Sequence, residues 1–156
     1  MLDRPTLPVL LACLLGAASC NSADPEPGPE VRCGELIDVL GTNVPGDSLI
    51  GAEPVSFLIS DAQAADEALA FRARWDAAAG DGGLDTIFDV APLGALERAS
   101  FAERMIEPAL AGPGAIYLDP SGATAAALRQ RHPGTRLVRV GPDRRIRTAQ
   151  EIVPAR

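Results

Sequence analysis

The sequence predicts an α/β domain in which a mixed β-sheet carries helices on both faces. From Pro54 onward, short apolar runs rich in β-branched and aromatic residues alternate three times with segments of helical character. The last two apolar runs are separated only by a turn. Alternation of strand and helix is typical of parallel strands, whereas a tight turn makes the final pair antiparallel. The expected order is therefore β-α-β-α-β-α-β-β.

The first strand and helix carry the clearest pattern. Val55 to Ile59 is apolar without alternation, which predicts a strand buried on both of its faces. Ser60 to Gln63 has the spacing of a capping box, and apolar residues then recur at intervals of four, three, four and three up to Gly80. That spacing predicts one buried helix face, made of Ala64, Ala68, Phe71, Trp75 and Ala78.

The remaining elements follow from turn residues and short apolar runs. Asp119-Pro120 supplies a helix cap and a proline suited to the first helical turn, and Gly141 to Asp143 supplies a hairpin turn. The predicted strands are 84–92, 115–118, 135–140 and 144–148. The predicted helices are 95–111, which Pro108 should kink or end, and 121–131.

The N-terminal segment has the anatomy of an export signal. Arg4 precedes an apolar run from Leu7 to Ala18 that is too short to cross a membrane as a helix. The small residues before Cys20 resemble a bacterial lipobox, which implies acylation of Cys20 and a membrane anchor; the alternative is ordinary secretory cleavage near Ser19. Asn21 favours the outer membrane of the cell envelope.

The expected organisation has four parts. Residues 1–19 form the signal peptide, 20–30 a linker rich in proline and acids, 31–53 an N-terminal extension, and 54–156 the folded domain. We expect the extension to contribute a short helix or strand at the edge of the domain.

Charge is unevenly distributed along the chain. The net charge is −7, yet seven arginines lie between residues 129 and 147, and the chain contains no lysine, which excludes lysine-dependent catalysis. An exported acidic protein is not expected to bind nucleic acid. The arginines are expected to form a solvated helix face and sheet edge. The alternative is a site for an anionic ligand or envelope protein, made of Arg136, Arg139, Arg144 and Arg145.

Residues 116–128, IYLDPSGATAAAL, and the hairpin that follows resemble the thioredoxin-like superfamily, in particular its redoxin and thiol-peroxidase branch. The resemblance extends over about residues 54–152 and implies a thioredoxin-like fold. It also implies that the cis-proline of the family falls on Pro133 and its threonine on Thr135. Arg144 replaces the glycine that the family carries in the hairpin turn.

The reactive thiol that the resemblance implies is absent from the sequence. A redoxin places a cysteine at the start of the helix after the first strand, where the helix N-terminus lowers the thiol pKa. Residues 60–67 contain no cysteine and three acids. Once Cys13 leaves with the signal and Cys20 is acylated, Cys33 is the remaining thiol. The alternatives for Cys33 are an inert small residue or a displaced redox thiol acting near Pro133.

Other chemistries find little support. His132 is the single histidine, so a metal site or a catalytic triad has no second member, and we expect no metal and no cofactor. Two pairs of acids, Asp85 with Asp89 and Asp61 with Asp66, suggest acid–base catalysis only weakly. The leading expectation is a lipid-anchored envelope protein that acts by binding or scaffolding through a redox-inactive domain. The alternative is a thiol-dependent oxidoreductase or peroxidase that uses Cys33.

Overall fold

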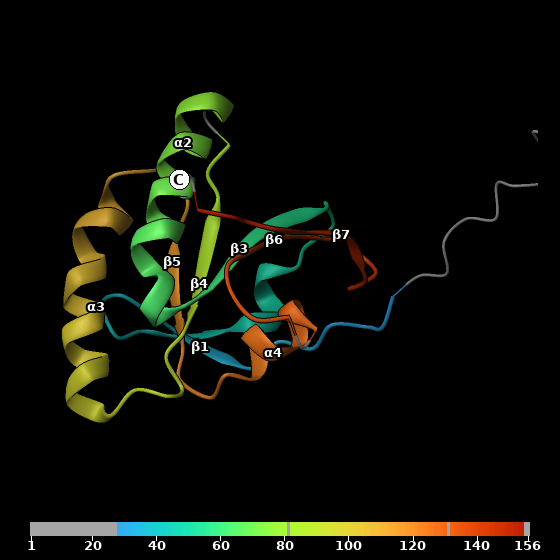
Figure 1. Cartoon of the computed structure of the whole chain (residues 1–156). Coiled ribbons are helices and arrows are strands. Elements are labelled where there is room, and N and C mark those ends of the chain that lie inside the picture. The colour runs from blue at the N-terminus through green and yellow to red at the C-terminus, as the bar shows by residue number, and fades with distance from the viewer. Residues whose placement is uncertain (1–27, 81, 131, 155–156) are drawn as a thin grey trace, which may run out of the picture.

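The structure is a computed structural model that describes residues 28–80, 82–130 and 132–154. One mixed sheet with the strand order β2-β1-β5-β4-β3-β6-β7 forms its centre (Figure 1). The strands are β1 (Glu35–Asp38), β2 (Asn43–Pro45), β3 (Val55–Asp61), β4 (Asp85–Asp89), β5 (Ile116–Asp119), β6 (Arg136–Val140) and β7 (Ile146–Glu151). Strands β3, β4 and β5 are parallel to one another, and every other pairing is antiparallel. The predicted mixed sheet is confirmed.

Helices cover both faces of the sheet, as predicted. The helices are α2 (Ala65–Ala79), α3 (Ala95–Leu110) and α4 (Ala123–Arg129), with short 3₁₀ turns η1 (Gly46–Leu49) and η2 (Ala62–Ala64). Helices α2 and α3 lie together on one face, where Ala68 and Phe101 join a cluster around Leu58 and Phe88 (Figure 1). Helix α4 packs on the other face through Leu128, against a cluster around Phe57.

The segment 31–53 adds two strands to the five that the sequence predicts. Strand β1 pairs with β5, and Leu36 is fully buried in the core beneath α4. The turn to β2 is held by the Asp38 carboxylate, which accepts the N–H groups of Leu40 and Thr42 at 2.9 and 2.8 Å. These strands have four and three residues, which is too short for periodicity to separate them from loop.

The predicted capping box at the start of α2 is wrong. Strand β3 continues through Ser60 to Asp61 and is followed by η2, so no side chain caps the helix. The predicted buried face is also partly wrong, since Ala78 is exposed and Arg72 is buried. The sequence signal failed because an arginine on an apolar face is normally read as solvent-exposed.

The buried side chain of Arg72, in α2, binds backbone carbonyl groups from three other segments. Its side chain is 4% exposed, and its guanidinium donates to the carbonyl oxygens of Leu84, Pro108 and Gly114. Burial lowers the pKa of this guanidinium, and the neighbouring Asp76 opposes that shift. Pro108 lies in the last turn of α3, where carbonyl groups lack the usual partner four residues on. Arg72 therefore supplies a hydrogen-bond donor to the Pro108 carbonyl oxygen at the end of this helix. It joins α2 to the end of α3 and to the loop before β5.

The hairpin between β6 and β7 is confirmed, with a turn in which Arg144 donates its N–H to Gly141 at 2.9 Å. Arg144 has a φ of +60°, which lies in the left-handed region. Its side chain forms an ion pair of 2.8 Å with Asp47 from η1. Arg144 therefore occupies a position that needs left-handed backbone, and its side chain gains a contact there.

Candidate functional site

Each of the three parallel strands ends in an aspartate at the same edge of the sheet. Asp61 of β3 is the register partner of Asp89 of β4, and Asp89 is the register partner of Asp119 of β5. In open α/β sheets, ligand sites lie outside the carboxyl ends of the strands. This row of carboxylates is therefore the first candidate for a functional site.

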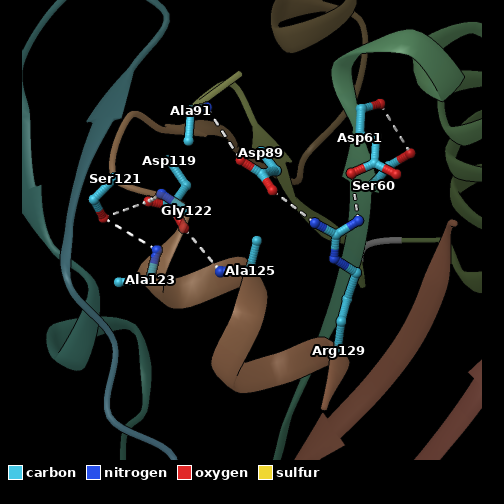
Figure 2. Close-up of polar contacts among 10 residues, drawn as sticks. All are labelled: Ser60, Asp61, Asp89, Ala91, Asp119, Ser121, Gly122, Ala123, Ala125 and Arg129. Carbon is cyan, nitrogen blue, oxygen red and sulfur yellow. Dashed lines mark hydrogen bonds and ion pairs between the residues drawn. The ribbon is translucent and has the colours of Figure 1, made fainter. Parts of the chain in front are cut away.

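Arg129 joins two of these aspartates from the last turn of α4. Its guanidinium donates to Asp61 through one nitrogen and to Asp89, at 2.7 Å, through another (Figure 2). The Arg129 side chain is 11% exposed and that of Asp89 is 14% exposed, whereas that of Asp61 is 41% exposed. The guanidinium neutralises one of the two carboxylate charges, and Asp61 is the member of this cluster that solvent and a ligand can reach.

Asp119 has a different task, which is to hold the start of α4. Its carboxylate accepts the N–H groups of Gly122 and Ala125 at 2.9 and 2.8 Å and the hydroxyl of Ser121 at 3.0 Å (Figure 2). The prediction that Asp119 is the N-cap and Pro120 the first helical residue is wrong, because the N-cap is Gly122 and α4 begins at Ala123. The Asp119 side chain still holds the start of the helix through the Ala125 N–H. Gly122, with a φ of +73°, provides the left-handed turn between them.

A buried hydroxyl pair lies behind Asp61. The Ser60 and Thr135 hydroxyl oxygens are 2.7 Å apart, and the residues are 0% and 3% exposed. Ser60 therefore bonds across to the start of β6 instead of capping α2. The resemblance placed the family's threonine on Thr135, and this residue does contact the end of β3.

Asp61 lines two hollows, and a third adjoins them. One of about 580 Å³ is lined by Asp61, Arg129, His132 and Pro133. A smaller one of about 140 Å³ is lined by Asp61, Gln63 and Leu93 among others. A third, of about 570 Å³, continues from there between the start of α2 and the first half of α3. The described residues contain no cis peptide bond, so Pro133, which lines the first hollow, follows a trans bond.

Cys33 lies in different surroundings from Pro133. Its N–H donates to the Asp47 carboxylate at 2.9 Å, and its thiol is half-buried against the core cluster beneath α4. Burial, with a further contribution from Asp47, raises the pKa of the Cys33 thiol to about 11. The pKa of Asp47 is lowered, chiefly by the hydrogen bond from the Cys33 N–H and next by the hydrogen bond from Arg144. A thiol in this environment stays protonated at neutral pH and is a poor nucleophile.

The arginines of the hairpin are largely committed to contacts within the chain. Arg144 pairs with Asp47, and Arg145 donates to the Gly28 carbonyl oxygen at 2.7 Å. Arg136 is half-buried at the start of β6, and Arg139 is exposed on the same strand. The structure therefore does not gather the four predicted arginines around one open surface.

Cys20, the predicted lipidation site, lies outside the described residues, as does the signal peptide. Within the described ranges, no helix has the length and apolar character that crossing a membrane requires. The same part of the chain holds no group of three His, Cys, Asp or Glu side chains arranged for a metal ion.

The pairing of Asp61 with Asp89 through Arg129 was not predicted from the sequence. The predicted pairs of carboxylates were Asp61 with Asp66 and Asp85 with Asp89, which are close in sequence. The overlooked signal is that each of the predicted strands 55–59, 84–92 and 115–118 has an aspartate within three residues of its carboxyl end. Parallel strands bring their carboxyl ends to one edge of a sheet, so these aspartates should lie close together. Arg129 carried no comparable signal, since it stands among six other arginines of the same segment.

Comparisons with known proteins identify the fold. No protein-family model matches this sequence, and no curated protein sequence matches it. Among solved structures, the pneumococcal exposed lipoprotein thioredoxin of Streptococcus pneumoniae superposes with a TM-score of 0.58 at 14% identity, covering 79% of this chain and 91% of that one. The thioredoxin domain of a thiol-disulfide oxidoreductase from Bacteroides vulgatus gives 0.54 at 12% identity, covering 85% and 91%. The fold of this chain is thioredoxin-like.

Proposed function

We propose that this protein is a lipid-anchored component of the bacterial cell envelope whose thioredoxin-like domain acts by binding a partner and not by thiol chemistry. The observation that carries the proposal is the chemistry at the end of β3. The position at which a redoxin would hold a thiolate is occupied by Asp61, bound to Arg129, and by the acids Asp66 and Glu67 in the first turn of α2. Negative charge at that position opposes a thiolate and favours a cationic ligand.

Two observations support the anchor. The sequence ends its apolar signal segment with small residues followed by Cys20, and a linker rich in proline and acids comes next. A solved structure with the same fold carries the name exposed lipoprotein thioredoxin. A cysteine that carries several acyl chains holds a protein at a membrane more firmly than a single fatty acid chain would. Asn21 leads us to place the anchor in the outer membrane.

The alternative is a thiol-dependent oxidoreductase or peroxidase that uses Cys33. Two solved structures of similar fold favour it, since one is named as a thiol-disulfide oxidoreductase and the other as a putative thiol:disulfide interchange protein. The raised pKa of Cys33 opposes it, because the thiolate is the reactive species. The contacts of Cys33 and the hollow beside Pro133 also have no residue in common.

The two functions are separated by an activity assay on the mature lipoprotein in detergent micelles. Insulin reduction and peroxide consumption are measured for the wild type and for Cys33→Ser, beside an active redoxin. We expect no turnover above the uncatalysed rate in either form. Turnover comparable to that of the active redoxin, lost in Cys33→Ser, would establish the alternative.

The anchor is tested by growing cells with an alkyne-bearing fatty acid. We expect label on the wild type and none on Cys20→Ser, and we expect the labelled protein in the outer-membrane fraction. An unlabelled wild-type protein released into the periplasm would contradict the anchor and would indicate ordinary cleavage near Ser19.

A further inference from the structure

The three hollows adjoin one another along the carboxyl edge of the sheet, and together they are called the trough. The hollow between α2 and α3 shares Ala62, Gln63 and Leu93 with the small hollow beside it. The small hollow in turn shares Asp61 with the hollow at Pro133. A long, open trough of this kind suits an extended chain better than a compact small molecule.

The end of the trough between α2 and α3 carries apolar side chains on a wall that hydrogen bonds hold in place. Leu96 is 85% exposed, and Leu93 and Phe101 lie beside it in the lining. The loop that carries Leu93 is held by Arg98, which donates to its carbonyl oxygen at 2.8 Å. The start of α3 is held by Glu97, whose carboxylate accepts the Gly94 N–H at 2.7 Å. An exposed leucine on a preorganised wall is typical of a surface that a partner covers.

Acidic side chains outnumber arginines along the trough as a whole. Its lining contains four acidic side chains and two arginines, a formal excess of two negative charges among these six groups. The acids are Asp61, Asp66, Asp89 and Glu97, and the arginines are Arg104 and Arg129. Arg129 is paired with both Asp61 and Asp89. Arg104 is 3.8 Å from the 94% exposed Asp66 and 5.7 Å from the ring of Phe101, so it lies at the far, apolar end.

We infer that the trough binds an extended segment of a partner protein, with an arginine or lysine of that segment at Asp61 and an apolar side chain against Leu93 and Leu96. This rests on the proposed binding function and names the chemistry of its partner. Charge complementarity selects the basic residue, and the exposed leucine selects the apolar one. A guanidinium suits Asp61 best, because it donates two parallel hydrogen bonds to a carboxylate.

A second copy of this chain fits the trough less well. Its basic hairpin is the obvious candidate to enter an acidic trough. However, Arg144 is paired with Asp47, Arg147 is paired with Asp143, and Arg145 donates to Gly28 within the same chain. Insertion of the hairpin would require these contacts to break. A segment of another protein could offer an arginine or lysine without breaking any contact in this chain.

The test uses the full mature lipoprotein in detergent micelles and fluorescein-labelled heptapeptides of serine and glycine. Each peptide carries one arginine and one leucine separated by one to four residues. We expect at least one spacing to raise the fluorescence anisotropy on binding. Replacing its arginine by glutamate, or its leucine by serine, should weaken binding about tenfold or more, and 0.5 M salt should weaken the arginine peptide in the same direction.

Matched variants locate the peptide. Asp61→Asn and Leu96→Ser should each weaken binding about tenfold. Glu53→Gln, an exposed acid before the other end of β3, and Leu110→Ser, an equally exposed leucine at the far end of α3, should leave it unchanged. Circular dichroism establishes whether each variant is folded. Because Leu96 is exposed, Leu96→Ser should stay folded and should report on binding in the trough even if Asp61→Asn unfolds the domain.

Several results would overturn the inference. These are no binding of any arginine peptide, equal binding of the glutamate peptide, unchanged binding by Leu96→Ser, or self-association that the arginine peptide displaces from the trough. Each of these outcomes leaves the lack of thiol turnover untouched, so failure of this inference and failure of the proposed function are distinguishable.

Discussion

Arg129, in the last turn of α4, donates a hydrogen bond of 2.7 Å to Asp89 at the end of β4, although 40 positions separate the two residues. The same guanidinium reaches Asp61 at the end of β3. Helix α4 lies on the opposite face of the sheet from α2 and α3 (Figure 1). One side chain therefore fastens the helix of one face to the edge of two central strands, and it determines how much negative charge that edge presents.

Replacing Arg129 should destabilise the domain more than the loss of a surface ion pair does. Arg129→Met leaves two carboxylates without their partner, one of them 14% exposed, and we expect a loss of about 2 kcal/mol in the free energy of unfolding. Arg129→Lys should lose less, since an ammonium keeps the charge but lacks the fork that reaches both acids. Urea unfolding measures both. Equal stability of Arg129→Met and wild type would show that the network contributes nothing.

Replacing Arg72 should have a still larger effect. Arg72→Met removes the donor for three carbonyl oxygens around a side chain that is 4% exposed, and we expect a loss of about 3 kcal/mol. The matched control is Arg74→Met on the exposed face of the same helix, where the loss of a cation–π contact with Phe71 should cost at most about 0.5 kcal/mol. Thermal unfolding of the two variants tests the contrast, and similar melting temperatures would contradict it.

The hairpin turn should be more stable with glycine than with alanine at position 144. Both Arg144→Gly and Arg144→Ala lose the ion pair with Asp47, which is partly exposed and contributes about 0.5 kcal/mol. Only alanine retains the cost of the left-handed backbone, about 1 kcal/mol. We therefore expect Arg144→Gly to lie close to the wild type and Arg144→Ala about 1 kcal/mol below Arg144→Gly. Chemical denaturation in parallel decides the order of the three proteins.

The raised pKa of Cys33 makes a prediction about alkaline pH. The ordinary value is 9.0 and the folded value is about 11, so between these pH values the unfolded chain loses the proton while the folded chain keeps it. The unfolded state then binds fewer protons, and the stability present below pH 9 falls as the pH rises toward 11. Iodoacetamide should correspondingly alkylate folded Cys33 slowly at pH 8 and faster toward pH 11.

The control for this prediction is Cys33→Ser, which removes the titrating thiol and leaves the other groups in place. The difference in unfolding free energy between wild type and this variant should be constant below pH 9 and should shrink between pH 9 and 11. A difference that stays constant across this window, together with rapid alkylation at pH 8, would mean that the thiol is not desolvated.

Much of the fold could be predicted from local patterns. The apolar run Val55 to Ile59, the spacing of apolar residues through 64–75 and the turn at Gly141 to Asp143 each carry information within a few residues, and each element is present. The segment of β1 was predicted only as a short helix or strand, because the pairing that makes it a strand is with β5, which is distant in sequence. Arg72 was not expected inside because its partners are carbonyl groups, which have no signature in sequence.

The candidate site was less predictable for the same reason. The sequence by itself determined the order of the elements, the mixed sheet, and the presence of three acids without a cysteine at residues 60–67, because these depend on residue type and short spacing. Only the tertiary structure decided that Asp61 and Asp89 share Arg129, that Ser60 bonds to Thr135, and that the Cys33 N–H donates to Asp47. Those contacts join residues far apart in the chain, and they form only when strand register and helix packing bring the bonded groups together.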